Sequence, residues 1–276
     1  MTRERLDGIA LEVRAAGNGP SVLFLHGFTG RGADWSPFLP AVRASGHRTL
    51  VVDLLGHGRS AAPADPAEHA IERQSPRLAT LLRRSGAVPA IVVGYSLGAR
   101  VALRLAATEP DVVRALVLES PSAGIADADA RAARRASDDA LADAIELDGV
   151  AAFVDRWEAI PVFASERRLP ERRRARLRRE RLRNRPGGLA GALRGAGQGA
   201  MEPLHDRLGG IAVPTLVIAG GADATGLERA RAVAAGIPDA RLVVVPGRGH
   251  AVHREAPTTF RHLLIDQLDT WRTSAA

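Results

Sequence analysis

The sequence predicts an α/β fold, a mostly parallel, doubly wound sheet with one inserted helical segment. Short apolar runs rich in β-branched residues recur along the 276-residue chain, and helical patterns separate most of them. The runs do not alternate with polar residues, which indicates strands buried on both faces, as in a parallel sheet covered by helices. One long interval lacks such runs and shows helical periodicity alone, which predicts the insertion.

The elements follow one another in a repeated strand–helix order. Each predicted strand is a continuous apolar run, and each predicted helix carries apolar residues at helical spacing. The predicted strands lie at 21–25, 49–52, 91–93, 116–118, 215–218 and 241–245, and the predicted helices at 35–43, 71–84, 97–108 and 227–235. This alternation predicts a doubly wound sheet.

Residues 123–208 break this rhythm. The interval has no convincing strand and is divided only by Pro and Gly, and it is too long for a loop in a compact domain. We interpret 123–208 as an all-helical insertion, here called the cap segment. The predicted core then consists of 1–122 together with 209–276.

The composition excludes several classes of protein. Hydrophobic residues make up 46% of the chain, enough for a large core, and Cys is absent, which excludes disulfides, thiolate metal sites and cysteine nucleophiles. No apolar run reaches the roughly 18 residues of a membrane span, and the first residues are too polar for a signal peptide. We expect a cytoplasmic protein without membrane insertion; the sequence indicates no particular oligomeric state.

The positive charge is concentrated in one place. The net charge is +7, all 38 basic residues are Arg, and eleven of them fall in 166–185 beside only three Glu. Such a stretch could bind nucleic acid, but it lacks interleaved aromatic residues. A solvated helix face is the better interpretation, and we expect no nucleic-acid partner.

The strongest local motif is Gly94-Tyr95-Ser96-Leu97-Gly98. It follows the strand at 91–93 directly and opens the helix at 97–108. A serine at such a tight strand-to-helix turn has strained backbone, and the small flanking residues allow the turn. The helix also directs free N–H groups and its positive dipole end toward the site. The motif predicts Ser96 as the reactive hydroxyl.

A second motif, His26-Gly27-Phe28-Thr29-Gly30, follows the first predicted strand. A Gly-rich turn there can direct the backbone N–H of Phe28 at a developing oxyanion, with the N–H of Leu97 as its partner. We interpret His26, and His57 in a later turn, as structural histidines.

A reactive serine needs a histidine, and the histidine needs an acid. In folds with this motif the chain order is Ser, acid, His. Asp223 follows the strand at 215–218 and is the predicted acid, with Glu119 as the alternative. His250 follows the last predicted strand and is preferred over His253. No cluster has metal-ligand spacing, so we expect no metal.

These motifs together indicate the α/β-hydrolase fold, and further segments resemble a narrower family. From residue 24 to nearly the end, the chain is similar to 2-succinyl-6-hydroxy-2,4-cyclohexadiene-1-carboxylate synthase of menaquinone biosynthesis. The segments that discriminate lie in the cap segment, because caps vary with substrate. The similar segments are FLHGFTGRGADW, DLLGHGRS, GYSLGAR, LVLESPSAGI, RAARRASDDALADAIE, FVDRWEAIPVFAS, RLRNRPGGLAGALRGAGQG and GRGHAVHRE.

The resemblance implies a lyase that needs no cofactor. The family eliminates pyruvate from 2-succinyl-5-enolpyruvyl-6-hydroxy-3-cyclohexene-1-carboxylate, a small anionic substrate. Ser96, polarised by His250 and Asp223, would then act as the base that removes a ring proton. The Phe28 and Leu97 N–H groups would hold the charge that develops on the succinyl ketone oxygen.

The resemblance also implies a set of substrate-binding residues. Arg is suited to bind carboxylates through two parallel hydrogen bonds. Arg135 is adjacent to Arg134 and is the alternative if the match to the family motif is shifted by one residue. The chain departs from the family pattern after Asp223, where Ala-Thr-Gly stands for x-Lys-Phe. The implied binding residues are Tyr95, Arg100, Arg134, Trp157 and Arg181.

Two other classes of function stay open. The triad alone would suit a carboxylesterase or a C–C bond hydrolase that works through an acyl-enzyme on Ser96. A non-catalytic binding protein of the same fold is the third hypothesis, although such a protein has no need of an intact triad. Pyruvate release favours the lyase, and covalent labelling of Ser96 with turnover of activated esters favours the hydrolase.

Overall fold

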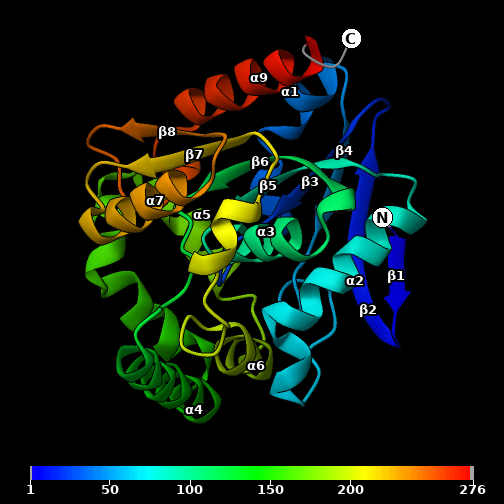
Figure 1. The fold of residues 1–276 in the computed structure, drawn as a ribbon. Coiled ribbons are helices and arrows are strands. Elements are labelled where there is room, and N and C mark those ends of the chain that lie inside the picture. Colours follow the sequence, from blue (N-terminus) through cyan, green and yellow to red (C-terminus); the bar gives the residue numbers. More distant parts are fainter. Residues whose placement is uncertain (1, 274–276) are drawn as a thin grey trace.

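An eight-stranded sheet forms the centre of the computed structural model, which describes residues 2–273 (Figure 1). The strand order is β1-β2-β4-β3-β5-β6-β7-β8. Strands β3 to β8 run parallel to one another, whereas β2 pairs antiparallel with β4, and β1 pairs antiparallel with β2 at the edge. The strands are β1 (Thr2–Leu6), β2 (Ile9–Ala16), β3 (Ser21–Leu25), β4 (Arg48–Val52), β5 (Ala90–Tyr95), β6 (Val113–Glu119), β7 (Thr215–Gly220) and β8 (Ala240–Val245).

Helices cover both faces of the sheet, which confirms the doubly wound α/β fold (Figure 1). On one face α1 (Leu39–Ala44) and α9 (Pro257–Thr273) pack on the strands through apolar side chains such as Phe260. On the other face lie α2 (Ile71–Arg84), α3 (Leu97–Thr108) and α7 (Ala224–Gly236). The central strands are therefore buried on both faces, and this explains why their sequences are apolar throughout.

The helix predicted at 35–43 is wrong in extent. The structure has a 3₁₀ turn, η1 (Gly32–Trp35), followed by the short helix α1. Pro37 and Pro40 explain the difference, because proline lacks the N–H that a helix interior needs. Pro40 is tolerated at the start of α1, where that N–H would have no helical partner.

Sequence analysis missed the N-terminal hairpin of β1 and β2. Leu6 pairs with Ile9 across a two-residue turn in which Asp7 and Gly8 both have positive φ, +52° and +77°. Asp-Gly is the preferred pair for such a turn. The polar sequence of β1 hid the strand, since an edge strand carries charges that a central strand does not.

The chain between β6 and β7 forms helices, and no strand is found in this described stretch. Its longest helix, α4, bends at Gly149, whose φ of +81° suits glycine. Helices α4 and α6 share a small apolar core around Phe153 and Leu189. The division at 123 and 208 stays a prediction. The helices are α4 (Ala128–Ala159), η4 (Pro161–Arg168), α5 (Glu171–Arg181), α6 (Pro186–Ala196) and η5 (His205–Gly210).

Candidate active site

Ser96 lies between the last residue of β5 and the first of α3, in a strained backbone conformation with φ +50° and ψ −104°. Such an angle is uncommon for a residue with a Cβ and needs a tightly packed surrounding. Gly98 supplies it, because a Cβ at this position would lie 2.2 Å from the carbonyl oxygen of Leu25. Close packing of α3 against β3 thus fixes the turn that presents the Ser96 hydroxyl.

The structure brings Ser96, His250 and Asp223 into one hydrogen-bonded chain. His250 Nε2 lies 3.0 Å from Ser96 Oγ, and His250 Nδ1 lies 2.7 Å from Asp223 Oδ2. Asp223 caps α7 and also accepts a hydrogen bond from the Gly226 N–H at 3.0 Å. Burial alone would raise the pKa of Asp223, but the hydrogen bonds from His250 and Gly226 outweigh burial and lower it. The carboxylate is therefore charged at neutral pH and can orient the imidazole.

The two alternative residues, Glu119 and His253, pair with each other instead. The His253 N–H donates to Glu119 Oε1 at 2.9 Å, and its ring Nδ1 lies 2.8 Å from Oε2. Both side chains are buried, and His253 stacks on Trp35. This pair braces the end of β6 and makes no contact with the Ser96 hydroxyl among the interactions of residues 2–273.

Phe28 and Leu97 lie at the wall of the cavity that contains Ser96. Leu97 is the first residue of α3, so its N–H has no partner within the helix. Beside Phe28, His26 donates from Nδ1 to the Gly27 carbonyl and accepts from the Leu54 N–H at Nε2. His26 thus holds the loop in place, as sequence analysis expected, and burial lowers its pKa.

A cavity of about 830 Å³ lies between the sheet and the cap segment and reaches Ser96 and His250. Tyr95 and Trp157 line it, and the Trp157 ring packs 5.3 Å from that of Phe28. Five arginines line the cavity beside only two carboxylates, so its wall is strongly positive. The arginines are Arg100, Arg134, Arg156, Arg168 and Arg229, and the carboxylates are Asp138 and Asp223.

Arg100 and Arg134 both line the cavity, and their binding of the substrate stays a prediction. Arg100 is buried, and its Nη1 donates to the Ala196 carbonyl at 2.7 Å. Burial, and then the nearby charge of Arg134, lower the Arg100 pKa to about 10, which leaves it charged at neutral pH. Arg134 Nε pairs with Asp138 at 2.9 Å. Arg135, the alternative in register, is exposed and does not line the cavity.

Arg181 is not among the residues that line the cavity, and its binding of the substrate stays a prediction. Its guanidinium is only 5% exposed and pairs with Glu166 at 2.6 Å and with Glu158 at 3.1 Å. It also lies 5.4 Å from the centre of the Phe163 ring. Two carboxylates therefore already satisfy this charge, and Arg181 joins α5 to α4 and η4.

The comparisons with known proteins agree with this geometry. The sequence matches the α/β hydrolase fold family over residues 20–257. A Bacillus subtilis protein named provisionally as 2-succinyl-6-hydroxy-2,4-cyclohexadiene-1-carboxylate synthase is 38% identical over 264 residues, 95% of this chain and 96% of that protein. A Salmonella typhimurium protein with the same synthase name is 33% identical over 239 residues, 86% of this chain and 89% of that protein.

The chain belongs to this synthase family within the α/β hydrolase fold. A solved structure described as MenH from S. aureus agrees, with a TM-score of 0.91 at 29% identity. The alignment covers 99% of this chain and 100% of that one, the cap segment included.

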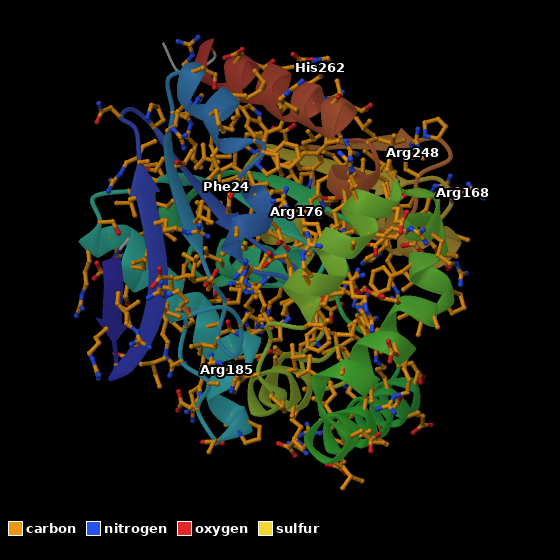
Figure 2. All side chains as sticks on the ribbon, turned by 180° about the vertical axis from the view of Figure 1, so that it is seen from behind. Phe24, Arg168, Arg176, Arg185, Arg248 and His262 are labelled. Atoms are coloured by element: carbon orange, nitrogen blue, oxygen red, sulfur yellow. The ribbon has the colours of Figure 1, made fainter. Side chains whose placement is uncertain are left out.

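Sequence analysis missed three arginines at the cavity of this synthase-family chain. Arg156 lies on α4 and pairs with Asp148 at 2.9 Å. Arg168 is exposed at the end of η4 and lies at the outer edge of the molecule in Figure 2. Arg229 lies on α7, six residues beyond Asp223. No motif marks them among 38 arginines, since only the folded chain decides which ones face inward.

Within residues 2–273, no group of three or more His, Asp or Glu side chains could hold a metal ion. No helix in this range is long and apolar enough to cross a bilayer.

Proposed function

We propose that this chain is a lyase of menaquinone biosynthesis that eliminates pyruvate from 2-succinyl-5-enolpyruvyl-6-hydroxy-3-cyclohexene-1-carboxylate. The product is 2-succinyl-6-hydroxy-2,4-cyclohexadiene-1-carboxylate, the compound in the names of its relatives. One observation carries the proposal. The hydrogen-bonded side chains of Ser96, His250 and Asp223 face the same cavity as five arginines. The guanidinium groups of these arginines can bind a ligand that carries several carboxylates.

In the proposed reaction Ser96 acts as a base. A serine hydroxyl is too weakly acidic to do so alone, so His250 Nε2 takes its proton as the Ser96 oxygen removes a proton from the ring. Asp223 holds the imidazole in the tautomer that accepts at Nε2, because its carboxylate takes the hydrogen bond from Nδ1. His250 then carries a positive charge that Asp223 stabilises.

The electrons of the broken C–H bond move toward the succinyl ketone. The charge on the ketone oxygen is stabilised by the backbone N–H groups of Phe28 and Leu97. As the electron pair returns from the ketone oxygen to the ring, a second ring double bond forms and the C–O bond to the enolpyruvyl group breaks. The leaving enolpyruvate takes up a proton and becomes pyruvate. Nothing is oxidised or reduced overall, so the reaction calls for no redox cofactor, and no acyl-enzyme forms.

The residues of the cavity wall would hold the substrate in the orientation that this step requires. Arg100 is fixed by the carbonyl of Ala196, so its remaining N–H groups can meet a carboxylate with little loss of freedom. Arg134 lies on the cap segment, opposite the helix that carries Arg100. Tyr95 and Trp157 would pack against the ring, and the buried indole N–H of Trp157 has no partner among the described residues. We place the protein in the cytoplasm, as the sequence predicts.

The test is to supply the enolpyruvyl substrate and follow pyruvate by its reduction to lactate with NADH. We expect the wild-type chain to release pyruvate, and Ser96→Ala to lower kcat by about 1,000-fold or more because the base is lost. Ser137→Ala serves as the control, because Ser137 is also at the cavity wall but has no hydrogen bond to the triad. Pyruvate release no faster than in the absence of protein would refute the lyase. A burst with activated esters would instead favour the hydrolase.

A further inference from the structure

Arg229 is a cation without a partner in the cavity wall. Its side chain is partly buried on α7, and it makes no ion pair or hydrogen bond with any residue that the structure describes. Three of the other cavity arginines are engaged, Arg100 with a carbonyl and Arg134 and Arg156 with carboxylates. Arg168, the fourth, is exposed and solvated by water. A partly buried, unpaired guanidinium is unfavourable, which points to a missing anion.

The charges around Arg229 make its charged form still less stable when no ligand is bound. Burial and then the charge of Arg134 lower the Arg229 pKa, and together they outweigh the carboxylates of Asp223 and Glu228, which raise it. Arg134 and Arg229 in turn both lower the pKa of Arg100. Three guanidinium groups from α3, α4 and α7 therefore repel one another at one cavity. The carboxylate of Asp223 forms its hydrogen bonds with His250 and Gly226, not with any of these three arginines.

We infer that Arg229 is a substrate-binding residue, which forms with Arg100 and Arg134 one site for the carboxylates of the ligand. This inference rests on the proposed function and names the residues that select its substrate class. The site would favour ligands with two or more carboxylates over neutral esters, since each added carboxylate relieves the repulsion within the cluster.

The same helix provides a matched control. Arg231 lies two residues further along α7, is exposed, and does not line the cavity. Residues two apart on a helix point in very different directions, so the same substitution at 231 changes helix propensity and net charge without reaching the site. Arg229→Lys is the conservative variant, which keeps the charge and loses the planar fork.

The experiment measures pyruvate release by the wild type, Arg229→Ala, Arg229→Lys and Arg231→Ala. We expect Arg229→Ala to raise KM by about 10- to 100-fold with kcat within about threefold, because the triad is intact. Arg229→Lys should recover part of this loss, and Arg231→Ala should match the wild type. The Tm of ligand-free Arg229→Ala should equal or exceed that of the wild type, because a repulsion is removed, a result that a purely structural Arg would not give.

A second readout does not depend on catalysis. Propane-1,2,3-tricarboxylate is titrated calorimetrically into each protein, and its affinity should fall at least tenfold in Arg229→Ala and stay unchanged in Arg231→Ala. Unchanged KM and unchanged tricarboxylate affinity in Arg229→Ala would overturn the inference, as would equal losses in Arg231→Ala. A wild type that releases no pyruvate refutes the proposed lyase alone, and the titration still decides the anion site.

Discussion

At the scale of single residues, the candidate site depends on the partners that each side chain finds. Asp223 and Glu119 both follow a strand, yet only Asp223 reaches the histidine beside Ser96. Glu119 pairs with His253 instead. The same distinction separates Arg229, which forms no ion pair or hydrogen bond within residues 2–273, from Arg181, which pairs with two carboxylates.

Asp223→Asn tests the acid of the triad. An amide at this position would donate to His250 Nδ1 and so leave the proton on Nε2, where the ring must accept from Ser96. We expect kcat to fall by about 10,000-fold. Steady-state pyruvate release and the Tm check this, with Glu119→Gln measured beside it. An Asp223→Asn protein that keeps a tenth of the wild-type kcat, or a Glu119→Gln protein that loses as much kcat while still folded, would contradict the assignment.

The sequence predicted the triad residues because each one follows an apolar strand at a recognisable turn. Which arginines face the cavity could not be predicted in the same way. Arg134 and Arg135 are adjacent in the sequence, and only the direction of α4 separates them. Arg181 and Arg229 differ in the ion pairs that they form after folding: Arg181 pairs with Glu158 and Glu166, whereas Arg229 forms no ion pair with a residue that the structure describes.

At the scale of elements, strands with continuous apolar runs were predicted and strands with interspersed charges were not. Each of the six predicted strands falls within one of β3 to β8. The central strands among them are apolar because they are buried on both faces, whereas β8 is a half-exposed edge strand that is nevertheless rich in Val. The hairpin of β1 and β2 carries alternating charge and escaped this criterion. Helices α2 and α3 begin and end where the sequence predicts, whereas prolines shortened α1.

Buried charge holds the cap segment to the core. Glu166 of η4 is 6% exposed and pairs with Arg181 of α5 and with Arg254 of α8 (Val252–Glu255). Arg254 also pairs with Asp34 of η1 at 3.0 Å. Burial would raise the Glu166 pKa, but the charges of Arg254 and Arg181 outweigh it and lower the pKa. Glu166 therefore joins η4 to α5 and α8, and Arg254 extends the network to η1 through Asp34.

Glu166→Gln should destabilise the protein at neutral pH by about 3 kcal/mol, because it removes one partner from a buried ion pair. The folded-state pKa of Glu166 is lowered, so its contribution is complete above the ordinary value of 4.5 and is lost as the pH falls below that value. We therefore expect the gap in free energy of unfolding between wild type and Glu166→Gln to be constant above pH 4.5 and to narrow as the pH falls below that value.

Denaturant unfolding at several pH values measures this gap. Glu171→Gln is the matched control, because Glu171 is exposed at the start of α5. A gap that stays constant with pH, or one as large for Glu171→Gln, would show that the Glu166 network does not hold the cap segment.

At the scale of the whole molecule, the cap segment and the core form one site. Ser165 of η4 donates to Glu255 Oε1 at 2.8 Å, and Glu255 Oε2 accepts from the N–H of Gly249 at 2.8 Å. Gly249 directly precedes His250, so a contact from the cap segment reaches the loop of the candidate base system. The cap segment thus contributes cavity arginines and also supports the loop that carries His250.

The central claim is that Ser96 acts as a base, without a covalent intermediate. The direct measurement quenches the reaction during steady-state turnover of the enolpyruvyl substrate and records pyruvate and the intact mass of the protein in the same samples. The account predicts that pyruvate accumulates while the mass of the wild-type chain stays unchanged. A substrate-derived adduct that rises and falls with turnover, and is missing in Ser96→Ala, would contradict it.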